Sequence, residues 1–410
     1  MQYSIRKTEK KGQVRIILPA SKSINNRLLV LSALSKGKIQ LAKLSQSDDS
    51  QIMYSLLNSE NKIKNAGHAG TVMRFLTAFY SICPGEILLT GSERMKSSPI
   101  AELVDALRII GAKIEYTGKK GFPPLKIMGK ELTGGKISIE SGISSQYISA
   151  LMMIGSSLKN GLEIELKGDT ISSSYINLTL GLLKQTGIKA HREGKIIIIN
   201  NFVFKNMKME VEADWSSASY WFSIVGLKNE LDILLPGLDQ NSLQGDAEIR
   251  NIFSKLGVKS HFSNEGLTLS AIKQEINFFE YDFRDNPDMV QTFIPYCVAK
   301  DIPFSFSGCR SLRIKETDRI LALANEFRKF EVELTFSEDG EYISWNGNSK
   351  PDWTKPVIID TYDDHRMALG MAPLSIVTSE IIINEPDVVS KSYPGFWKDL
   401  KKAGFSISEI

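Results

Sequence analysis

The pattern of apolar and polar positions repeats along the chain. In each repeat an amphipathic helix is expected to end near a glycine, and two short β-branched runs separated by a polar turn follow it. The expected helix ends lie about 70 to 76 positions apart, which is too regular to be chance. They are Gly111, Gly187, Gly257, Glu331 and Gly404.

A second, more hydrophobic helix is expected in each repeat, and a small polar cluster precedes it. From the second cluster onward the clusters recur about every 74 residues, whereas the first two are only about 48 residues apart. The first repeat is therefore expected to lack a hairpin of roughly 20 to 25 residues. The six helices begin in the segments 21–29, 69–75, 143–151, 215–222, 286–293 and 363–370.

Six repeats divide into two groups of three, which predicts an α/β protein with two domains. Residues 21–213 would form one domain, and residues 1–20 and 214–410 the other, because the apolar segment 14–20 is expected to complete a sheet of the later repeats. A chain of 410 residues with 42% apolar residues also exceeds the usual size of one domain. A solenoid is the competing interpretation, but solenoid repeats are shorter, about 20 to 50 residues.

Composition narrows the function classes. The 50 basic and 47 acidic residues give a net charge of +3, so no overall field predicts a nucleic-acid or membrane partner, and any anion site must be local. The apolar runs are too short to span a membrane and the N-terminal segment lacks a signal sequence, so a cytoplasmic protein is expected. The 3 cysteines form no CxxC pair, and no HExxH or phosphate-loop motif occurs, so we expect neither metal nor cofactor.

The polar clusters indicate anion binding. Ser, Thr, Asp and Gly placed before an apolar helix cap its free N–H groups, and the same groups bind anions together with the helix dipole. Taken alone, each cluster has a second explanation as an ordinary cap or an exposed basic helix end. The densest one, residues 311–319, would be explained about as well by a salt-bridged surface helix. Convergence of several such helix ends would favour a phosphate ligand.

The order of the motifs resembles the 5-enolpyruvylshikimate 3-phosphate synthase family over essentially the whole chain. The motifs are SKSxxxR, SDD, AGTxMR, GxxRMKxxP, SSQ, SxxY, SSASY, NSxQGD, RxKETDR, DHRMA and KSYP. The resemblance implies a two-domain inside-out α/β barrel with three βαβαββ repeats in each domain and the active site in the cleft between them. It also implies transfer of the enolpyruvyl group of phosphoenolpyruvate to the 5-hydroxyl of shikimate 3-phosphate, on the route to aromatic amino acids.

The resemblance assigns residues to each substrate and to proton transfer. Asp288 is expected to act as the base on the acceptor hydroxyl, and Glu316, with Lys22, to move the proton at C3 of phosphoenolpyruvate. His365 is the fourth member of this catalytic set, and the division of roles among the four is a hypothesis because interacting ionisable groups titrate as a set. Shikimate 3-phosphate is expected to contact Ser23, Arg27, Ser144, Ser145, Ser172, Tyr175, Asp288 and Lys315, and phosphoenolpyruvate to contact Lys22, Gly70, Arg94, Gln146, Arg319, Arg366 and Lys391.

Two other functions stay open at this point. The sister enolpyruvyl transferase that acts on UDP-N-acetylglucosamine shares the sixfold architecture, but typically carries a cysteine acid on a mobile loop. Here Cys83 follows an apolar helix and Cys297 lies within another. A non-catalytic phosphometabolite-binding protein is the second alternative, which the shortened first repeat favours and the intact Asp288, Glu316 and Lys22 oppose. No segment predicts a protein partner, so a monomer is expected.

Overall fold

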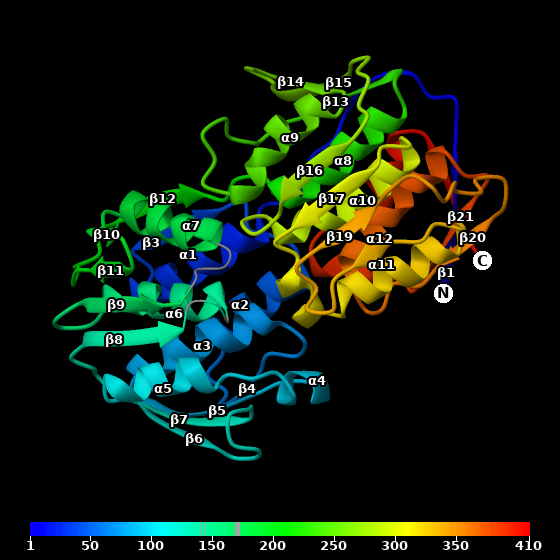
Figure 1. Cartoon of the computed structure of the whole chain (residues 1–410). Helices are drawn as coiled ribbons and strands as arrows, with labels where there is room; N and C mark the ends of the chain where they lie inside the picture. Colours follow the sequence, from blue (N-terminus) through cyan, green and yellow to red (C-terminus); the bar gives the residue numbers. More distant parts are fainter. Residues whose placement is uncertain (141, 143, 169–172) are drawn as a thin grey trace. The chain divides into compact units, whose positions relative to one another are not determined.

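The chain folds into two compact units in the computed structural model, which describes residues 1–140, 142, 144–168 and 173–410. Unit 1 contains residues 1–19 and 212–410, and unit 2 contains residues 20–211. The chain thus leaves unit 1 after Pro19 and returns to it at Glu212, as the colours of Figure 1 show. Unit 2 is a continuous insertion between the first strands of unit 1 and its remaining repeats.

The sheets of unit 1 share one strand order. In two of the three sheets, a hairpin pairs with the second of two parallel neighbours, so that the strands read 1-2-4-3 across the sheet. In the first of these two sheets the parallel neighbours are separated along the chain by all of unit 2, and in the second they are connected through a helix. Their strands are β2 (Gly12–Arg15), β13 (Leu231–Leu235), β15 (Gly266–Ala271) and β14 (Val258–Ser263), and then β16 (Phe279–Asp282), β17 (Phe304–Ser307), β19 (Ile343–Trp345) and β18 (Thr335–Phe336).

The N-terminus completes the third sheet of unit 1. Strand β1 (Gln2–Lys7) takes the fourth place, antiparallel to both β21 (Ile381–Asn384) and β22 (Phe405–Glu409), and β20 (Val357–Ile359) lies beyond β21. The sequence pattern did not predict β1. It did predict that segment 14–20 would join this group of repeats, and β2 pairs in parallel with β13, although the strand ends at Arg15.

Unit 2 contains a shortened sheet. It consists of β12 (Met207–Glu210) and β3 (Ile39–Ala42), which pair in parallel. Among the described residues no hairpin adds further strands to this sheet, which confirms the shortened first repeat. The other two sheets keep the full 1-2-4-3 order. Their strands are β4 (Ile63–Asn65), β5 (Gly85–Thr90), β7 (Leu125–Gly129) and β6 (Lys113–Tyr116), and then β8 (Gly135–Glu140), β9 (Leu162–Lys167), β11 (Ile196–Ile199) and β10 (Ala190–Glu193).

Each polar cluster of the sequence lies at the start of a helix. Ser21, Ser144, Asp214 and Asp364 are N-caps whose side chains accept hydrogen bonds from backbone N–H groups of the first turn. None of the helices in the described ranges is long and apolar enough to cross a membrane. The helices that follow the clusters are α1 (Lys22–Leu34), α3 (Gly70–Ile82), α6 (Ser145–Gly155), α8 (Trp215–Leu227), α10 (Val290–Ala299) and α12 (His365–Met371).

The amphipathic helices end at the predicted positions. Gly111, Gly187, Gly257, Glu331 and Gly404 all adopt positive φ, between 64° and 96°. This left-handed conformation closes a helix C-terminus and favours glycine, which has no Cβ to clash. These helices are α5 (Ala101–Ile109), α7 (Ser173–Gln185), α9 (Ile249–Lys255), α11 (Arg319–Arg328) and α13 (Phe396–Lys402). Within the described residues, α2 (Asp48–Asn58) and the short α4 (Glu93–Lys96) are the other α-helices.

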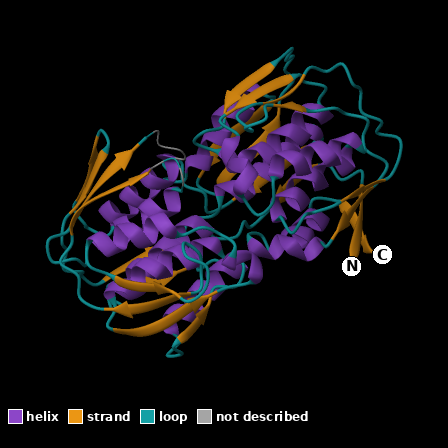
Figure 2. Cartoon of the chain, turned by 60° about the horizontal axis from the view of Figure 1, so that its bottom comes forward, coloured by secondary structure: helices purple, strands orange, loops and turns teal. Residues whose placement is uncertain are grey.

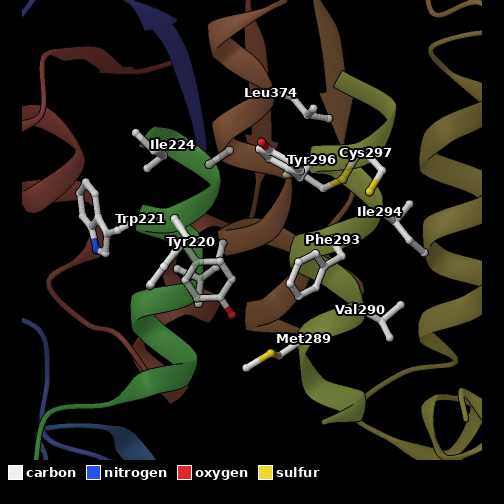
Figure 3. Close-up of a cluster of buried hydrophobic side chains, with 14 of the residues drawn as sticks. Tyr220, Trp221, Ile224, Met289, Val290, Phe293, Ile294, Tyr296, Cys297 and Leu374 are labelled. Carbon is white, nitrogen blue, oxygen red and sulfur yellow. The ribbon is translucent and has the colours of Figure 1, made fainter. Parts of the chain in front are cut away.

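Within each unit the helices lie in the interior and the sheets lie around them at the surface (Figure 2). Helices α8 and α10 are buried on nearly all sides, as expected for helices packed among other elements rather than facing water. Figure 3 shows Tyr220 of α8 and Phe293 of α10 between the two helices, whereas Trp221 points to the other side of α8; all three are buried. This packing holds the helix N-termini, which carry the polar clusters, in defined positions.

Replacing Gly111 by alanine should destabilise the protein by about 1–2 kcal/mol, because alanine must adopt φ +96°. The new Cβ meets only Leu132 Cδ2 at 3.9 Å, so the effect comes from the backbone. Gly118→Ala is the matched control, since Gly118 has no positive φ and its Cβ would make an ordinary contact of 3.6 Å. Urea unfolding followed by circular dichroism measures both, and equal midpoints for the two variants would contradict the assignment.

Candidate active site

Arg27 connects three helices of unit 2. Its Nε donates to Thr179 Oγ1 of α7 at 2.7 Å, and its Nη2 donates to Ser149 Oγ of α6 at 3.1 Å. The guanidinium also lies 5.4 Å from the ring centre of Phe75 in α3. The side chain is buried, which lowers the pKa of Arg27 to about 10, and these partners are all neutral. A buried cation with neutral partners gives this region of unit 2 a positive potential that favours an anion.

A second contact joins the first turns of α3 and α6. Arg74 Nη1 donates to Gln146 Oε1 at 2.7 Å. Gly70 begins α3, and a Cβ added to it would lie only 2.4 Å from the same Arg74 nitrogen. A Cβ at this position would therefore force the end of the Arg74 side chain to move from its place beside Gln146. The sequence pattern had placed Gly70 and Gln146 as candidates without indicating that Arg74 links them.

The remaining candidates of unit 2 lie at helix N-termini. Lys22 is the first residue of α1, and its Nζ lies 3.4 Å from the Asp49 carboxylate of α2. The backbone carbonyls of Ser23 and Tyr175 accept hydrogen bonds from Arg27, at 2.9 and 3.5 Å. These contacts bring the first turns of α1 and α7 together.

Four further predicted contacts belong to unit 2, and the structure describes three of them. Ser144 caps α6 and Ser145 is its first residue. Arg94 is exposed in α4, whose N-cap, Ser92, has its hydroxyl 3.1 Å from Nδ1 of His68. Ser172 lies outside the described residues.

Arg319 is the centre of a charged cluster in unit 1. Its Nε contacts Asp364 Oδ2, its Nη1 contacts Asp288 Oδ1, and its Nη2 contacts Glu316 Oε2, each at 2.7 Å. The side chain is only 1% exposed. Burial lowers the pKa of Arg319, but the three carboxylates together raise it by more, so the pKa lies above its ordinary value. The guanidinium is a permanent charge that holds three acidic groups from separate segments.

Asp288 is surrounded by cations. This residue of the 3₁₀ helix η2 (Pro287–Met289) contacts Arg319 at 2.7 Å, and both Lys315 Nζ and Arg366 Nη2 at 3.3 Å. Arg366 Nη1 also donates to the backbone carbonyl of Asp288 at 3.0 Å. The structure thus brings together five predicted residues from three segments, namely Asp288, Lys315, Glu316, Arg319 and Arg366.

Arg366 also contacts a second set of polar side chains, which the sequence motifs did not single out. Its Nη2 lies 3.4 Å from Ser216 Oγ, and Ser216 in turn donates a hydrogen bond to the carboxylate of Asp246. Asp246 is buried, and this burial raises its pKa to about 6 despite the nearby Arg366. Burial also raises the pKa of Tyr220, whose hydroxyl is 3.5 Å from Arg366, to about 12.

His365 and Lys391 lie beside this cluster in the sequence but are less tightly connected to it. His365 begins α12 and is 1% exposed, with its Nδ1 at 3.7 Å from Asp364 Oδ1. Lys391 ends the 3₁₀ helix η5 (Pro386–Lys391) and is partly exposed, and it forms no ion pair within 4.0 Å among the described residues.

The arrangement suits chemistry on anionic substrates. Permanent cations and helix N-termini bind phosphate and carboxylate groups. Carboxylates held against those cations can accept or return protons when a substrate displaces one of the contacts.

Comparison with known proteins identifies the family. The model of the family described as EPSP synthase (3-phosphoshikimate 1-carboxyvinyltransferase) matches residues 54–400. The chain belongs to the EPSP synthase family. A protein named 3-phosphoshikimate 1-carboxyvinyltransferase from Bacteroides fragilis is 47% identical over 393 residues, covering 96% of this chain and 95% of that protein. One of the same name from Sulfurovum is 33% identical and covers 94% and 95% of the two chains.

Solved structures confirm the expected fold. An EPSP synthase structure from Acinetobacter baumannii superimposes with a TM-score of 0.78 at 20% identity, and the match covers 100% of both chains. An enolpyruvyl transferase from Streptomyces tendae gives a TM-score of 0.74 at 10% identity. Both the resemblance to the EPSP synthase family and the α/β fold of repeated units are thus confirmed.

Sequence reasoning missed several residues that hold the site together. Asp364 binds Arg319 and caps α12, and Ser216 and Asp246 support Arg366. Each stands inside a motif already noted, namely DHRMA, SSASY and NSxQGD. An acidic residue directly before an apolar helix was the available signal for Asp364. Ser149 and Thr179 carried no local signal, because each lies within a helix like many ordinary core residues.

The raised pKa of Asp246 predicts a pH-dependent stability difference. The folded state binds the proton more tightly than the unfolded chain, where the carboxyl has a pKa near 3.8, so this contribution is complete below about pH 3.8 and disappears as the pH rises through about 6. Wild type should therefore lose roughly 2–3 kcal/mol relative to Asp246→Asn between pH 4 and pH 7. Unfolding free energies of both proteins across this range test it, and parallel pH profiles would refute it.

Proposed function

We propose that this protein transfers the enolpyruvyl group of phosphoenolpyruvate to the 5-hydroxyl of shikimate 3-phosphate. Membership of the EPSP synthase family supports the reaction. The observation that carries it at the level of residues is the set of contacts around Asp288, where three cations surround one carboxylate. Such a set can position a phosphorylated acceptor and remove its hydroxyl proton.

The first step forms a tetrahedral adduct. The acceptor oxygen bonds to C2 of phosphoenolpyruvate as its proton leaves, and C3 gains a proton. We assign the hydroxyl proton to Asp288, whose carboxylate is held by Lys315 and Arg319. We assign proton delivery at C3 to Glu316 with Lys22, and His365 stays a member of the catalytic set. The positive character that develops at C2 favours carboxylates close by.

The second step releases phosphate. C3 loses a proton, the double bond to C2 forms again, and the bond between C2 and the phosphate oxygen breaks. Cations stabilise the charge on the departing phosphate. We assign this role to Arg94, Arg319, Arg366, Lys22 and Lys391, with Gly70 and Gln146 as further phosphoenolpyruvate contacts.

Acceptor binding rests on the other predicted residues. We assign shikimate 3-phosphate to Ser23, Arg27, Ser144, Ser145, Ser172, Tyr175, Asp288 and Lys315. The buried positive charge of Arg27, with neutral partners, supports an anionic group nearby. We further propose that units 1 and 2 are the two functional domains, with boundaries near residues 20 and 213, and that residues from both act in one reaction.

The thiols argue against the UDP-N-acetylglucosamine reaction. Cys83 directly follows α3, so it lies at the opposite end of that helix from Gly70, about 20 Å away along the axis. Cys297 and Cys309 are fully buried, and burial raises the pKa of each of the three thiols. None of the three is therefore suited to serve as an exposed cysteine acid.

The deciding assay follows phosphate release from phosphoenolpyruvate with each acceptor in turn, without added metal. We expect release with shikimate 3-phosphate alone. Release only with UDP-N-acetylglucosamine would transfer the protein to the sister reaction. Binding of both substrates without release would leave the non-catalytic alternative. We also propose a monomeric, cytoplasmic protein, which light scattering and cell fractionation would test.

Asp288→Asn should lower kcat by about 10²- to 10⁴-fold, because the amide cannot accept the hydroxyl proton. The matched control is Asp282→Asn, which removes the same charge from an exposed side chain six residues earlier. Steady-state kinetics with both substrates give kcat, and thermal unfolding checks that both variants fold. Wild-type turnover by a folded Asp288→Asn enzyme would remove Asp288 from the mechanism.

Gly70→Ala should raise KM for phosphoenolpyruvate by about tenfold or more, with KM for shikimate 3-phosphate nearly unchanged. The added Cβ displaces the Arg74 guanidinium and breaks its hydrogen bond to Gln146, an interaction of a charged donor. Gly118→Ala serves as the control from the same unit. An equal rise in both KM values would instead indicate a general distortion of unit 2.

A further inference from the structure

A surface cavity of about 460 Å³ lies in unit 1, between helix α9 and the edge strand β14. None of the residues assigned above to either substrate lines it. The residues lining it within the described chain include no Asp or Glu, and most of them carry hydrogen-bond donors. The polar side chains from these two elements are Arg250, Asn251, Ser254, Lys259, Ser260 and His261.

Arg250 has the least satisfied side chain in this cavity. Its guanidinium lies over the rings of Trp215, at 5.7 Å, and Phe262, at 5.2 Å. Its Nε is buried and has no hydrogen-bond partner among the described residues, and no carboxylate there lies within the 4.0 Å of an ion pair. Arg250 lines the cavity, and a cation without an ion-pair partner leaves its charge available to an anion there.

The chemistry of the lining selects an oxyanion. A guanidinium, an ammonium group and hydroxyl donors together match the charge and the several acceptor oxygens of a phosphate group. Phe262 and Ile272 add an apolar wall that an organic group attached to the phosphate could contact. The volume is also within the range of small-molecule sites, about 300–1,000 Å³.

We propose that this cavity is a second anion site, which binds a phosphate-bearing small molecule through Arg250 and Lys259. The inference does not depend on the proposed reaction. Arg250 lies against the indole of Trp215, the first residue of α8, and the next residue, Ser216, contacts Arg366 and Asp246. An anion that attracts the guanidinium therefore changes the environment of Trp215. It also shifts the first turn of α8, whose Ser216 contacts the charged cluster through Arg366.

Tryptophan fluorescence of the full-length protein, titrated with inorganic phosphate, tests the proposal, with calorimetry as a second readout. Phosphate is also a product of the proposed reaction and binds at that site, so wild type should show two classes of binding. In Arg250→Gln/Lys259→Gln the cavity component should weaken by about tenfold or more, because two charged donors are lost. The matched control is Lys255→Gln/Lys273→Gln, which removes two exposed lysines that do not line the cavity.

Each outcome decides the proposal. The proposal is supported if Arg250→Gln/Lys259→Gln loses one class of phosphate binding and retains the other, while the control variant keeps both. Wild-type titration curves in that variant, or the same weakening in the control, overturn it. If the Arg250 substitution prevents folding, Lys259→Gln alone is compared with Lys255→Gln. Lys259 is exposed, so the single variant should fold, and an unchanged phosphate affinity of Lys259→Gln would then overturn the assignment.

Discussion

The buried guanidinium of Arg319 is the interaction on which the arrangement of unit 1 depends. Three carboxylates from different segments could not be held close together without it, because their mutual repulsion and the loss of hydration are both large in a buried environment. Arg319 compensates all three at once, since its planar group offers several donors in fixed directions. Removing Arg319 would take from the fully buried Asp364 the guanidinium that binds it, so the segments that carry these two residues are held to one geometry.

Unit 2 reaches a similar result with different chemistry. Its buried arginine, Arg27, bonds to the hydroxyls of Thr179 and Ser149 and to backbone carbonyls, and an aromatic ring covers it. Hydroxyls and carbonyls satisfy the donors without cancelling the charge. One unit therefore holds a compensated cluster with carboxylates available for proton transfer, and the other holds a cation whose charge remains available to an anionic ligand. This division suits a reaction that needs both proton transfer and anion binding.

The shortened sheet shows which parts of the repeat the site requires. The first repeat lacks its hairpin, yet it keeps α1 and α2, and these supply the contact between Lys22 and Asp49. Hairpins lie in the outer sheets, whereas the helix N-termini carry the polar clusters. Strand β12 from the end of unit 2 pairs with β3 and closes the shortened sheet. Loss of the hairpin thus shortens an outer sheet, and the charged residues of the first repeat keep their positions.

The sequence by itself determined the sixfold repeat, the positions of the helix ends and the polar clusters at the helix starts. Helix caps and left-handed residues depend on neighbours within about one turn, so Ser144, Asp214 and Gly111 carried readable signals. The eleven ordered motifs also identified the family before any contact was known. Only the tertiary structure decided which residues meet. Arg319 binds Asp364 across 45 residues and Arg27 binds Thr179 across 152, and β1 completes a sheet formed at the other end of the chain. The raised pKa of Asp246 likewise follows from burial by distant segments. Such contacts depend on how the repeats pack, and no local pattern encodes that.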